Sequence, residues 1–228
     1  MATNMIGFRV YTNSPRPAAE LTSAFRGVPT GHVCDAMDRL GALAPHIRPL
    51  RPDLYLCGPA LTVRTRPGDN LMVWKAIDVA RPGDVLVIAT YGHSTVSTFG
   101  EFVVMAAKAK GVAGIVCDGL CRDVGGIRAL DIPVYTAGSA PSSPGKDGPG
   151  EIGAAVTCGG VVVQPGDVVV GDEDGVVVVP LADAEAVCAG LEKIREKEAG
   201  MLRAIQAGQI VPGWVDEVLA AKGCQVIA

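Results

Sequence analysis

Two short segments of the chain carry residue types that could together bind a small acid. Gly100-Glu101 precedes an apolar pattern with helical spacing, and Arg122-Asp123 follows after twenty intervening residues. The first N–H groups of a helix have no partner within the helix and favour a carboxylate. Arginine offers a planar, permanently charged donor to a carboxylate or to an enolate oxygen. These segments therefore predict a site for a small anion.

Asp123 adds a hard oxygen ligand beside that arginine. One carboxylate with several water molecules suits Mg²⁺ or Mn²⁺ better than Zn²⁺. The three histidines do not have zinc spacing, and the seven cysteines contain no C-x-x-C pair. A plainer interpretation of Arg122-Asp123 is an ion pair at the surface, and Glu101 could merely favour a helix N-terminus.

Two loop residues are further candidates for contact with the ligand. His93 lies in the polar loop before Gly100, and Lys146 lies in the Pro- and Gly-rich segment Ser139–Glu151. A long loop without secondary structure inside one domain is often functional, and Lys146 could meet a second carboxylate of the ligand. The plainer interpretation of both side chains is that they are simply solvated.

The elements that position these residues alternate strand and helix over the first two thirds of the chain. In such an α/β arrangement the ends of neighbouring strands meet, so the loops after Ala89 and Cys117 are expected side by side. Strands are predicted at Ala60–Val63, Val85–Ala89, Gly114–Cys117, Val134–Thr136, Ala154–Val156, Val161–Val163, Val168–Gly171 and Val176–Val179. Helices are predicted at Ala18–Arg26, Thr30–Leu40, Leu71–Ala80 with Asn70 as N-cap, from Gly100 to Gly111, and in the tail at 182–207 and 214–222.

Composition limits the classes of partner. The 228 residues are 49% hydrophobic but only 4% aromatic, and the net charge is −4. That balance gives no footprint for a nucleic-acid backbone or an anionic membrane surface. No apolar run approaches the roughly 18 residues of a membrane helix, and the N-terminus does not resemble a secretory signal. We expect a cytoplasmic protein with reduced thiols.

Two look-alikes of phosphate-binding loops do not meet their structural requirements. Gly148-Pro-Gly-Glu-Ile-Gly153 matches G-x-G-x-x-G, but Pro149 opposes the strand–turn–helix context that this motif needs. Near Gly145-Lys146, Asp147 stands where a P-loop requires Ser or Thr. Neither segment predicts a nucleotide site.

The spacing of Glu101 and Arg122-Asp123 resembles the signature of the RraA-like family, which is named for a regulator of ribonuclease activity. That signature is an acidic residue, twenty intervening residues, and then Arg-Asp. The resemblance covers nearly the whole chain. It extends through Asp35-Ala-Met-Asp-Arg-Leu-Gly41, Gly58-Pro-Ala-Leu-Thr-Val63, Pro82-Gly-Asp-Val-Leu-Val87 and Pro165-Gly-Asp…Asp172-Glu-Asp-Gly-Val176…Pro180.

The resemblance implies an α/β fold of the β/β/α type seen in swivelling phosphohistidine domains. It implies one domain over residues 1–228, with a C-terminal helical extension at about 182–228, assembled as a homotrimer or homohexamer. It also implies that Asp123 holds Mg²⁺ or Mn²⁺ with Glu101 near the water shell, and that Arg122 stabilises a pyruvate enolate. Backbone N–H groups of Gly100, Glu101, Phe102 and Val103 would bind the substrate carboxylate.

Family aldolases also draw a glutamate from the C-terminal helix of a neighbouring subunit. A gapless count back from Ala207-Gly208 places this residue at Glu198. Glu198 falls on a helical stripe of apolar residues, which indicates a buried partner or an interface. The alternative is a carboxylate at the edge of the stripe that reaches solvent. The stripe consists of Val187, Leu191, Ile194, Leu202 and Ile205.

By this resemblance the chain is a class II pyruvate aldolase. Family aldolases act on 4-hydroxy-4-methyl-2-oxoglutarate and 4-carboxy-4-hydroxy-2-oxoadipate. Oxaloacetate decarboxylation is an expected second activity, because both reactions pass through the same enolate. The alternative is a non-catalytic protein that binds and regulates a ribonuclease. Gly126, where some members carry an acid, and the segment Pro141–Glu151 leave the substrate open.

Overall fold

The computed structural model describes residues 6–225 and 227, and its frame is a ten-stranded mixed sheet. Four neighbouring parallel strands form its centre. These strands are β3 (Leu56–Thr65), β4 (Val85–Ala89), β6 (Gly114–Cys121) and β7 (Val134–Ser139). The two in the middle, β4 and β6, are buried along their whole length, which is typical of parallel strands covered on both faces.

The other strands of this sheet lie at its edges or pair with part of one central strand. β8 (Gly150–Ile152) and β11 (Val168–Asp172) run antiparallel to β3, and β5 (Ser97–Phe99) runs parallel to the second half of β6. The remaining members are β1 (Arg9–Val10), β2 (Arg48–Pro49) and β12 (Gly175–Val179). A separate antiparallel pair consists of β9 (Val156–Cys158) and β10 (Val161–Val163).

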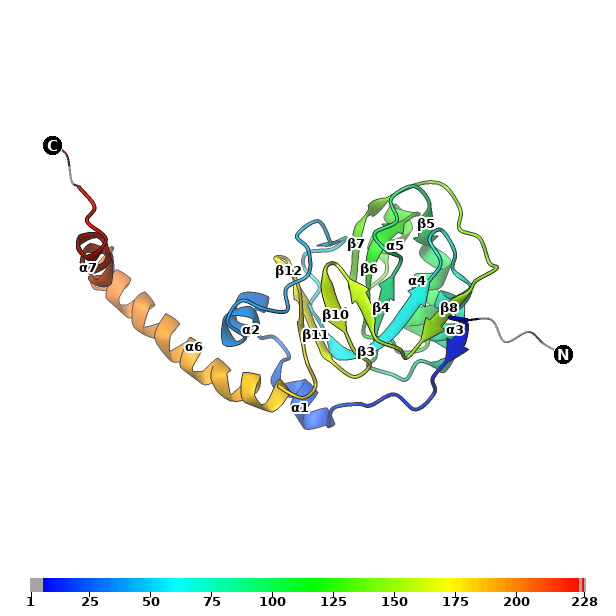
Figure 1. Cartoon of the computed structure of the whole chain (residues 1–228), viewed down its shortest axis with the longest axis horizontal. Helices are drawn as coiled ribbons and strands as arrows, with labels where there is room; N and C mark the ends of the chain where they lie inside the picture. Colours follow the sequence, from blue (N-terminus) through cyan, green and yellow to red (C-terminus); the bar gives the residue numbers. More distant parts are fainter. Residues whose placement is uncertain (1–5, 226, 228) are drawn as a thin grey trace.

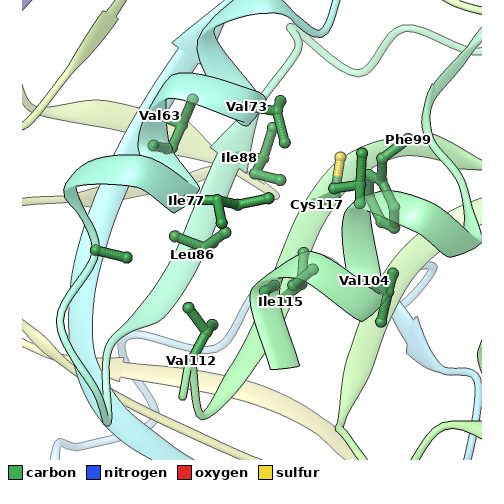
Figure 2. Close-up of a cluster of buried hydrophobic side chains, with 14 of the residues drawn as sticks. Val63, Val73, Ile77, Leu86, Ile88, Phe99, Val104, Val112, Ile115 and Cys117 are labelled. Atoms are coloured by element: carbon green, nitrogen blue, oxygen red, sulfur yellow. The ribbon is translucent and has the colours of Figure 1, made fainter. Parts of the chain in front are cut away.

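Three helices cover one face of the central strands. They are α3 (Leu71–Val79), α4 (Glu101–Ala109) and α5 (Val124–Ala129). Leu86 and Ile88 of β4 point to this face and lie beside Val73 and Ile77 of α3, as Figure 2 shows. The alternate residues Val85, Val87 and Ala89 point to the opposite face. Because side chains alternate along a strand, successive residues of β4 pack into two different cores.

The opposite face is covered by strands and by the terminal helices. Tyr135 of β7 packs there with residues of β9, β10, β11 and β12. A third cluster joins β11 and β12 to the remaining helices of the body, with Phe25 and Leu191 fully buried in it. Those helices are α1 (Ala19–Ala24), α2 (Thr30–Ala36) and the first part of α6 (Ala184–Gln206).

The C-terminal tail leaves this body. α6 projects away from the sheet, and α7 (Trp214–Ala221) lies at its far end (Figure 1). Val187 and Leu191 near the start of α6 are buried, whereas Leu202 and Ile205 near its end are about half exposed. Within the described residues, no helix has both the length and the hydropathy that crossing a membrane requires.

The predicted α/β class is confirmed, and several element bounds are corrected. The strand expected at Gly114–Cys117 continues to Cys121, and it pairs with β5, which was not predicted. The strand expected at Ala154–Val156 is wrong, because the chain forms β8 before it and β9 from Val156 onward. The sequence also did not predict the short elements β1, β2 and α5.

The second predicted helix is also shorter than expected. The helix expected at Thr30–Leu40 ends at Ala36, because Asp38 and Arg39 adopt left-handed backbone angles with φ of 51° and 68°. The helix expected at Ala18–Arg26 spans Ala19–Ala24. Both tail helices lie within their expected ranges.

Candidate active site

Two helix N-termini meet at the ends of neighbouring strands. β5 leads through Gly100 into α4, and β6 leads through Arg122 and Asp123 into α5. Because β5 pairs with the last residues of β6, the N–H of Arg122 donates to the carbonyl of Phe99 at 2.9 Å. This pairing places Gly100 directly beside Arg122-Asp123, although they are far apart in the sequence.

Gly100 permits the close approach of both functional side chains. A Cβ atom at this position would lie 2.4 Å from Asp123 Oδ2 and 3.1 Å from Arg122 Nε. Its φ of −139° is accessible to any residue, so the requirement for glycine is one of space and not of backbone conformation. The aspartate carboxylate and the guanidinium therefore pack against bare backbone.

Arg122 and Asp123 form an ion pair that opens onto solvent. Arg122 Nε lies 3.3 Å from Asp123 Oδ2, and the two side chains are 35% and 42% exposed. Arg122 Nη1 also donates a hydrogen bond to Ser143 Oγ, in the loop between β7 and β8. Asp123 occupies the left-handed region with φ of 57°, which aspartate tolerates better than most residues. The turn between β6 and α5 thereby aims the carboxylate at Gly100.

Glu101 lies over the first turn of α5. A Cβ atom at Gly126 would lie 2.3 Å from Glu101 Oε2, so the carboxylate of Glu101 occupies the space above that glycine. Gly126 has no side chain of its own, and the side chain of Glu101 fills the space beside it. The carboxylates of Glu101 and Asp123 therefore both lie where the N-termini of α4 and α5 meet.

The first N–H groups of α4 are only partly used within the chain. That of Glu101 donates to Asp123 Oδ2 at 3.3 Å, and that of Val103 donates to the carbonyl of Gly100 at 3.1 Å. Within the described part of the chain, the N–H of Phe102 has no acceptor. This donor at the positive end of a helix is suited to a carboxylate.

Beside these helix N-termini lies a cavity of about 210 Å³, a size suited to a small organic acid. Glu101, which was predicted as a catalytic and substrate-binding residue, does not line it. Six of the residues singled out in the sequence line it: Gly100, Phe102, Val103, Arg122, Asp123 and Lys146. Four more line it that the sequence did not indicate as site residues: Asn70, Trp74, Ser143 and Pro144.

Asn70 was predicted only as a helix cap. It does stand at the N-cap position of α3, but its side chain makes no capping hydrogen bond. Asp69 Oδ1 instead accepts the N–H of Leu71 at 2.9 Å. Asn70 is 5% exposed, and its Oδ1 is buried without a donor within the described residues. A buried amide with an unpaired oxygen beside a cavity is a signal of ligand contact that only the tertiary structure provides.

His93 does not line the cavity. Its Nε2 lies 3.1 Å from Thr95 Oγ1 within its own loop. The base of that loop is fixed by Asp118, whose Oδ1 accepts the N–H of Thr90 at 2.6 Å and whose Oδ2 accepts the N–H of Gly92 at 3.2 Å. Asp118 was expected in a loop after Cys117, but it is buried inside β6 and supports the neighbouring loop.

Glu198 is also remote from the cavity of its own chain. It lies on α6 with its side chain 58% exposed, and its Oε2 is 2.7 Å from His32 Nε2. Within one chain it therefore pairs with a histidine of α2. Its predicted position in the site of a neighbouring subunit stays a prediction.

The chemistry of the donor set fits a hydrated divalent cation. Within residues 6–225 and 227, no three His, Cys, Asp or Glu side chains come together as a metal cluster. Mg²⁺ is commonly held by one or two carboxylates and several waters, and Asp123 with Glu101 nearby offers such a set. Cys121, next to Arg122, is not a nucleophile at neutral pH, because burial raises the pKa of its thiol to about 11.

Comparison with known proteins identifies the family of this chain. The model of the RraA-like family, described as Aldolase/RraA, matches residues 30–178. A protein of Halalkalibacterium halodurans named "Putative 4-hydroxy-4-methyl-2-oxoglutarate aldolase" is 42% identical over 180 residues, which cover 79% of this chain and 84% of that protein.

Solved structures show the same fold. An uncharacterized protein of Pseudomonas syringae aligns with a TM-score of 0.76 at 26% identity, covering 85% of this chain and 96% of its own. Streptomyces coelicolor RraAS2, described as an unusual member of the RNase ES inhibitor RraA protein family, aligns with a TM-score of 0.74 at 32% identity. That alignment covers 82% of this chain and all of the other.

Proposed function

Because the chain belongs to the RraA-like family, we propose that it is a divalent-metal-dependent lyase that cleaves a 4-hydroxy-2-oxo dicarboxylic acid to release pyruvate. The observation that carries this proposal is the cavity in which a helix tip, a guanidinium and a carboxylate converge. Oxaloacetate decarboxylation would be its companion activity.

The 2-oxo acid end of the substrate would bind against α4. The free N–H of Phe102 at the positive end of the helix donates to the substrate carboxylate. Arg122 then faces the adjacent keto oxygen. When the bond between C3 and C4 breaks, its electron pair forms the enolate of pyruvate and negative charge appears on that oxygen. A guanidinium fixed by Asp123 and Ser143 stabilises the charge without having to reorganise.

Asp123 would hold Mg²⁺ or Mn²⁺, with Glu101 beside the water ligands. When bound, the cation would supply further positive charge near the oxygen of the developing enolate. Asp123 is already oriented for this role by the ion pair with Arg122 and by the N–H of Glu101.

The other end of the substrate would face the loop between β7 and β8. Lys146 and Asn70 line the cavity together with Trp74, so they offer a cation, an amide and an apolar wall. A distal carboxylate carried on C4 would pair with the Lys146 ammonium, while Trp74 contacts its apolar substituent. This arrangement favours a dicarboxylate over a substrate with a single carboxylate.

The cavity of one chain offers only one acid–base group besides its lysine and arginine. Asp123 is the only carboxylate that lines it among the described residues, and no histidine does. The C4 hydroxyl must lose a proton when C3 and C4 separate. A carboxylate from another subunit, Glu198 by the family resemblance, would supply the acceptor in a homotrimer or homohexamer. The exposed side chains of Phe102 and Met105 at the rim of the site are consistent with such a neighbour.

Metal dependence gives the direct test of this proposal. Pyruvate release from 4-hydroxy-4-methyl-2-oxoglutarate is followed with lactate dehydrogenase, first in excess chelator and then after addition of Mg²⁺ or Mn²⁺. We expect activity to vanish in chelator and to return when Mg²⁺ or Mn²⁺ is added. Activity that persists in chelator, together with borohydride trapping of substrate on a lysine, would contradict the metal mechanism and indicate a Schiff base.

A second candidate function rests on the similarity to an RNase inhibitor family member. In that case the chain binds a ribonuclease and the cavity has no role in that binding. A pull-down with the ribonuclease, combined with the pyruvate assay on the same preparation, separates the two. Binding without pyruvate release would favour regulation.

A further inference from the structure

Three Pro-Gly-Asp turns of the chain share one backbone form. They are Pro67-Gly68-Asp69, Pro82-Gly83-Asp84 and Pro165-Gly166-Asp167. In each turn the aspartate N–H donates to the carbonyl three residues earlier, at 3.1 to 3.2 Å, and the glycine has a φ between 67° and 88°. All three aspartates are almost completely buried, with exposed fractions of 3%, 0% and 4% in the order of the sequence.

Two of these aspartates bond to the first residue of their own turn. Asp84 Oδ2 accepts the N–H of Arg81 at 2.8 Å, and Asp167 Oδ2 accepts the N–H of Gln164 at 2.7 Å. Each carboxylate thus bonds to the first residue of the turn in which it stands. Each also has a partner outside its turn: Asp84 pairs with the guanidinium of Arg16, and Asp167 Oδ1 accepts the N–H of Leu181 at 2.9 Å. Together these bonds explain why a buried carboxylate is tolerated there, since a buried charge must be hydrogen-bonded.

Asp69 uses its carboxylate differently. Its Oδ2 accepts the N–H groups of Asp147 at 2.7 Å and of Gly148 at 3.1 Å, which lie 78 and 79 residues away. The N–H of Arg66, the counterpart of Arg81 and Gln164, donates instead to the carbonyl of Pro149 at 3.2 Å. The first turn is therefore bonded to the loop between β7 and β8.

These bonds hold the loop on both sides of Lys146. On one side, Gly145 pairs with this turn, with its N–H donating to the carbonyl of Gly68 at 2.7 Å and its carbonyl accepting the N–H of Asn70 at 3.0 Å. On the other side, Asp69 holds Asp147 and Gly148. Lys146 lies between the two fixed points and lines the cavity. Asn70, the other polar residue at that end of the cavity, is the next residue after Asp69.

We propose that Asp69 is a positioning residue that fixes Lys146 against the cavity and so determines the preference for a substrate with a distal carboxylate. This inference rests on the proposed function for its substrate class. Asp69 does not line the cavity itself, and it acts only through the loop. Arg122, in the half of the site proposed to bind pyruvate, meets the same loop at Ser143. That part of the loop is held separately, because the N–H of Ser97 donates to the carbonyl of Ser142 at 3.1 Å.

The experiment compares two reactions of the Mg²⁺-loaded enzyme. Exchange of the pyruvate methyl protons in D₂O needs only the pyruvate half of the site, whereas cleavage of 4-hydroxy-4-methyl-2-oxoglutarate needs both halves. In Asp69→Asn we expect the KM for the dicarboxylate to rise by about tenfold through loss of a charge-assisted contact at Lys146, with proton exchange changed by less than twofold. In a Lys146→Ala background the same substitution should add nothing.

Asp167→Asn is the matched control, because it removes an equally buried carboxylate from an equivalent turn far from the loop. If Asp69→Asn lowers both reactions in the same proportion, as a loss of stability would, or leaves the KM unchanged, the positioning role is wrong. Absence of proton exchange in the unaltered protein would instead contradict the proposed function.

A measurement on the unaltered protein covers the case in which Asp69→Asn does not fold. The amides of Asp147 and Gly148 donate to a buried carboxylate, so they should exchange with solvent deuterium slowly. Exchange at the rate of an unstructured loop would overturn the inference, whatever the enzyme activity proves to be.

Discussion

The cavity and the C-terminal tail are built in opposite ways. Around the cavity, residues 97–126 fix one another by short contacts within one chain, such as the pairing of β5 with β6 and the packing of Asp123 on Gly100. Along the tail, α6 and α7 carry large apolar side chains that are left exposed in the single chain. Leu202, Ile205, Ile210, Trp214, Val218 and Leu219 are all between 40% and 78% exposed.

This difference distinguishes residues that act within one chain from residues that act through another molecule. The cavity places its guanidinium, carboxylate and helix tip without help, so a defect there should abolish catalysis in any oligomeric state. In a single chain, the apolar surface of the tail is in contact with water. Large exposed apolar patches usually mark a binding surface. A defect there should act only through the contacts of the tail with another molecule.

The largest effect is expected from Arg122→Lys, which tests the cavity. Lysine keeps the charge but loses the fork that reaches Asp123 and Ser143 together, so kcat should fall by about 100- to 1,000-fold. Pyruvate release measures it. Arg128→Lys, an exposed arginine of α5 that bonds the carbonyl of Leu50, should stay within about twofold. A near-normal rate in Arg122→Lys would remove this residue from the mechanism.

Gly100→Ala should have the next largest effect. The new methyl group would displace the Asp123 carboxylate and the guanidinium, and a misplacement of about 1 Å can lower kcat/KM by about 100-fold. Thermal unfolding should change little, because the backbone angle suits alanine. Gly125→Ala is the control, since a Cβ atom there meets nothing within 4 Å. Equal kinetics for the two variants would show that the packing at Gly100 is unimportant.

Glu198→Gln tests whether the tail completes the cavity of a neighbouring subunit. Loss of a general acid–base group should lower kcat by about 100-fold. Mixed oligomers of Glu198→Gln and Arg122→Lys subunits, made by co-expression, should then recover activity, because some sites receive both intact residues. If Glu198 serves only its contact with His32, the mixture stays as inactive as its parts and His32→Ala reproduces the phenotype.

Leu202→Asp tests assembly without touching the cavity. In the proposed oligomer Leu202 would be buried between subunits, so a charge there should cost about 2 kcal/mol or more per contact and weaken association by at least about 30-fold. Light scattering after size-exclusion chromatography measures the mass. The same substitution at Glu196, a charged residue of α6, is the control. An unchanged mass would exclude this face of α6 from the interface.

The smallest effect concerns thiol reactivity. Burial raises the pKa of Cys57 and of Cys121 to about 11, so at pH 8 only about 0.1% of each thiol is in the thiolate form. Labelling of these two cysteines should accelerate only as the pH rises further.

Cys224, beyond α7, is exposed in the single chain. Labelling with a disulfide reagent should be faster at Cys224 in Leu202→Asp than in the unaltered protein. Equal rates would show that the oligomer leaves the tail uncovered.

Much of the fold followed from local pattern. The apolar run Val85–Ala89 and the run Val161–Val163 are strands with the expected bounds, because β-branched residues favour the strand conformation. β5 was not predicted, because three residues carry no periodicity and its formation depends on pairing with β6. The end of β6 was also misplaced, since a polar Asp118 inside a strand is stable only where Thr90 and Gly92 bond to it.

The sequence by itself indicated the half of the cavity at α4 and Arg122-Asp123, which we propose binds pyruvate. A helix start at Gly100-Glu101 and a strand end at Arg122-Asp123 follow from residue type and spacing, because strand order brings the ends of parallel strands together. Only the tertiary structure decided the other half. Asn70, Trp74 and Ser143 join the cavity through pairing between a turn and a loop nearly eighty residues apart, and such long-range pairing leaves no periodic signal in the chain.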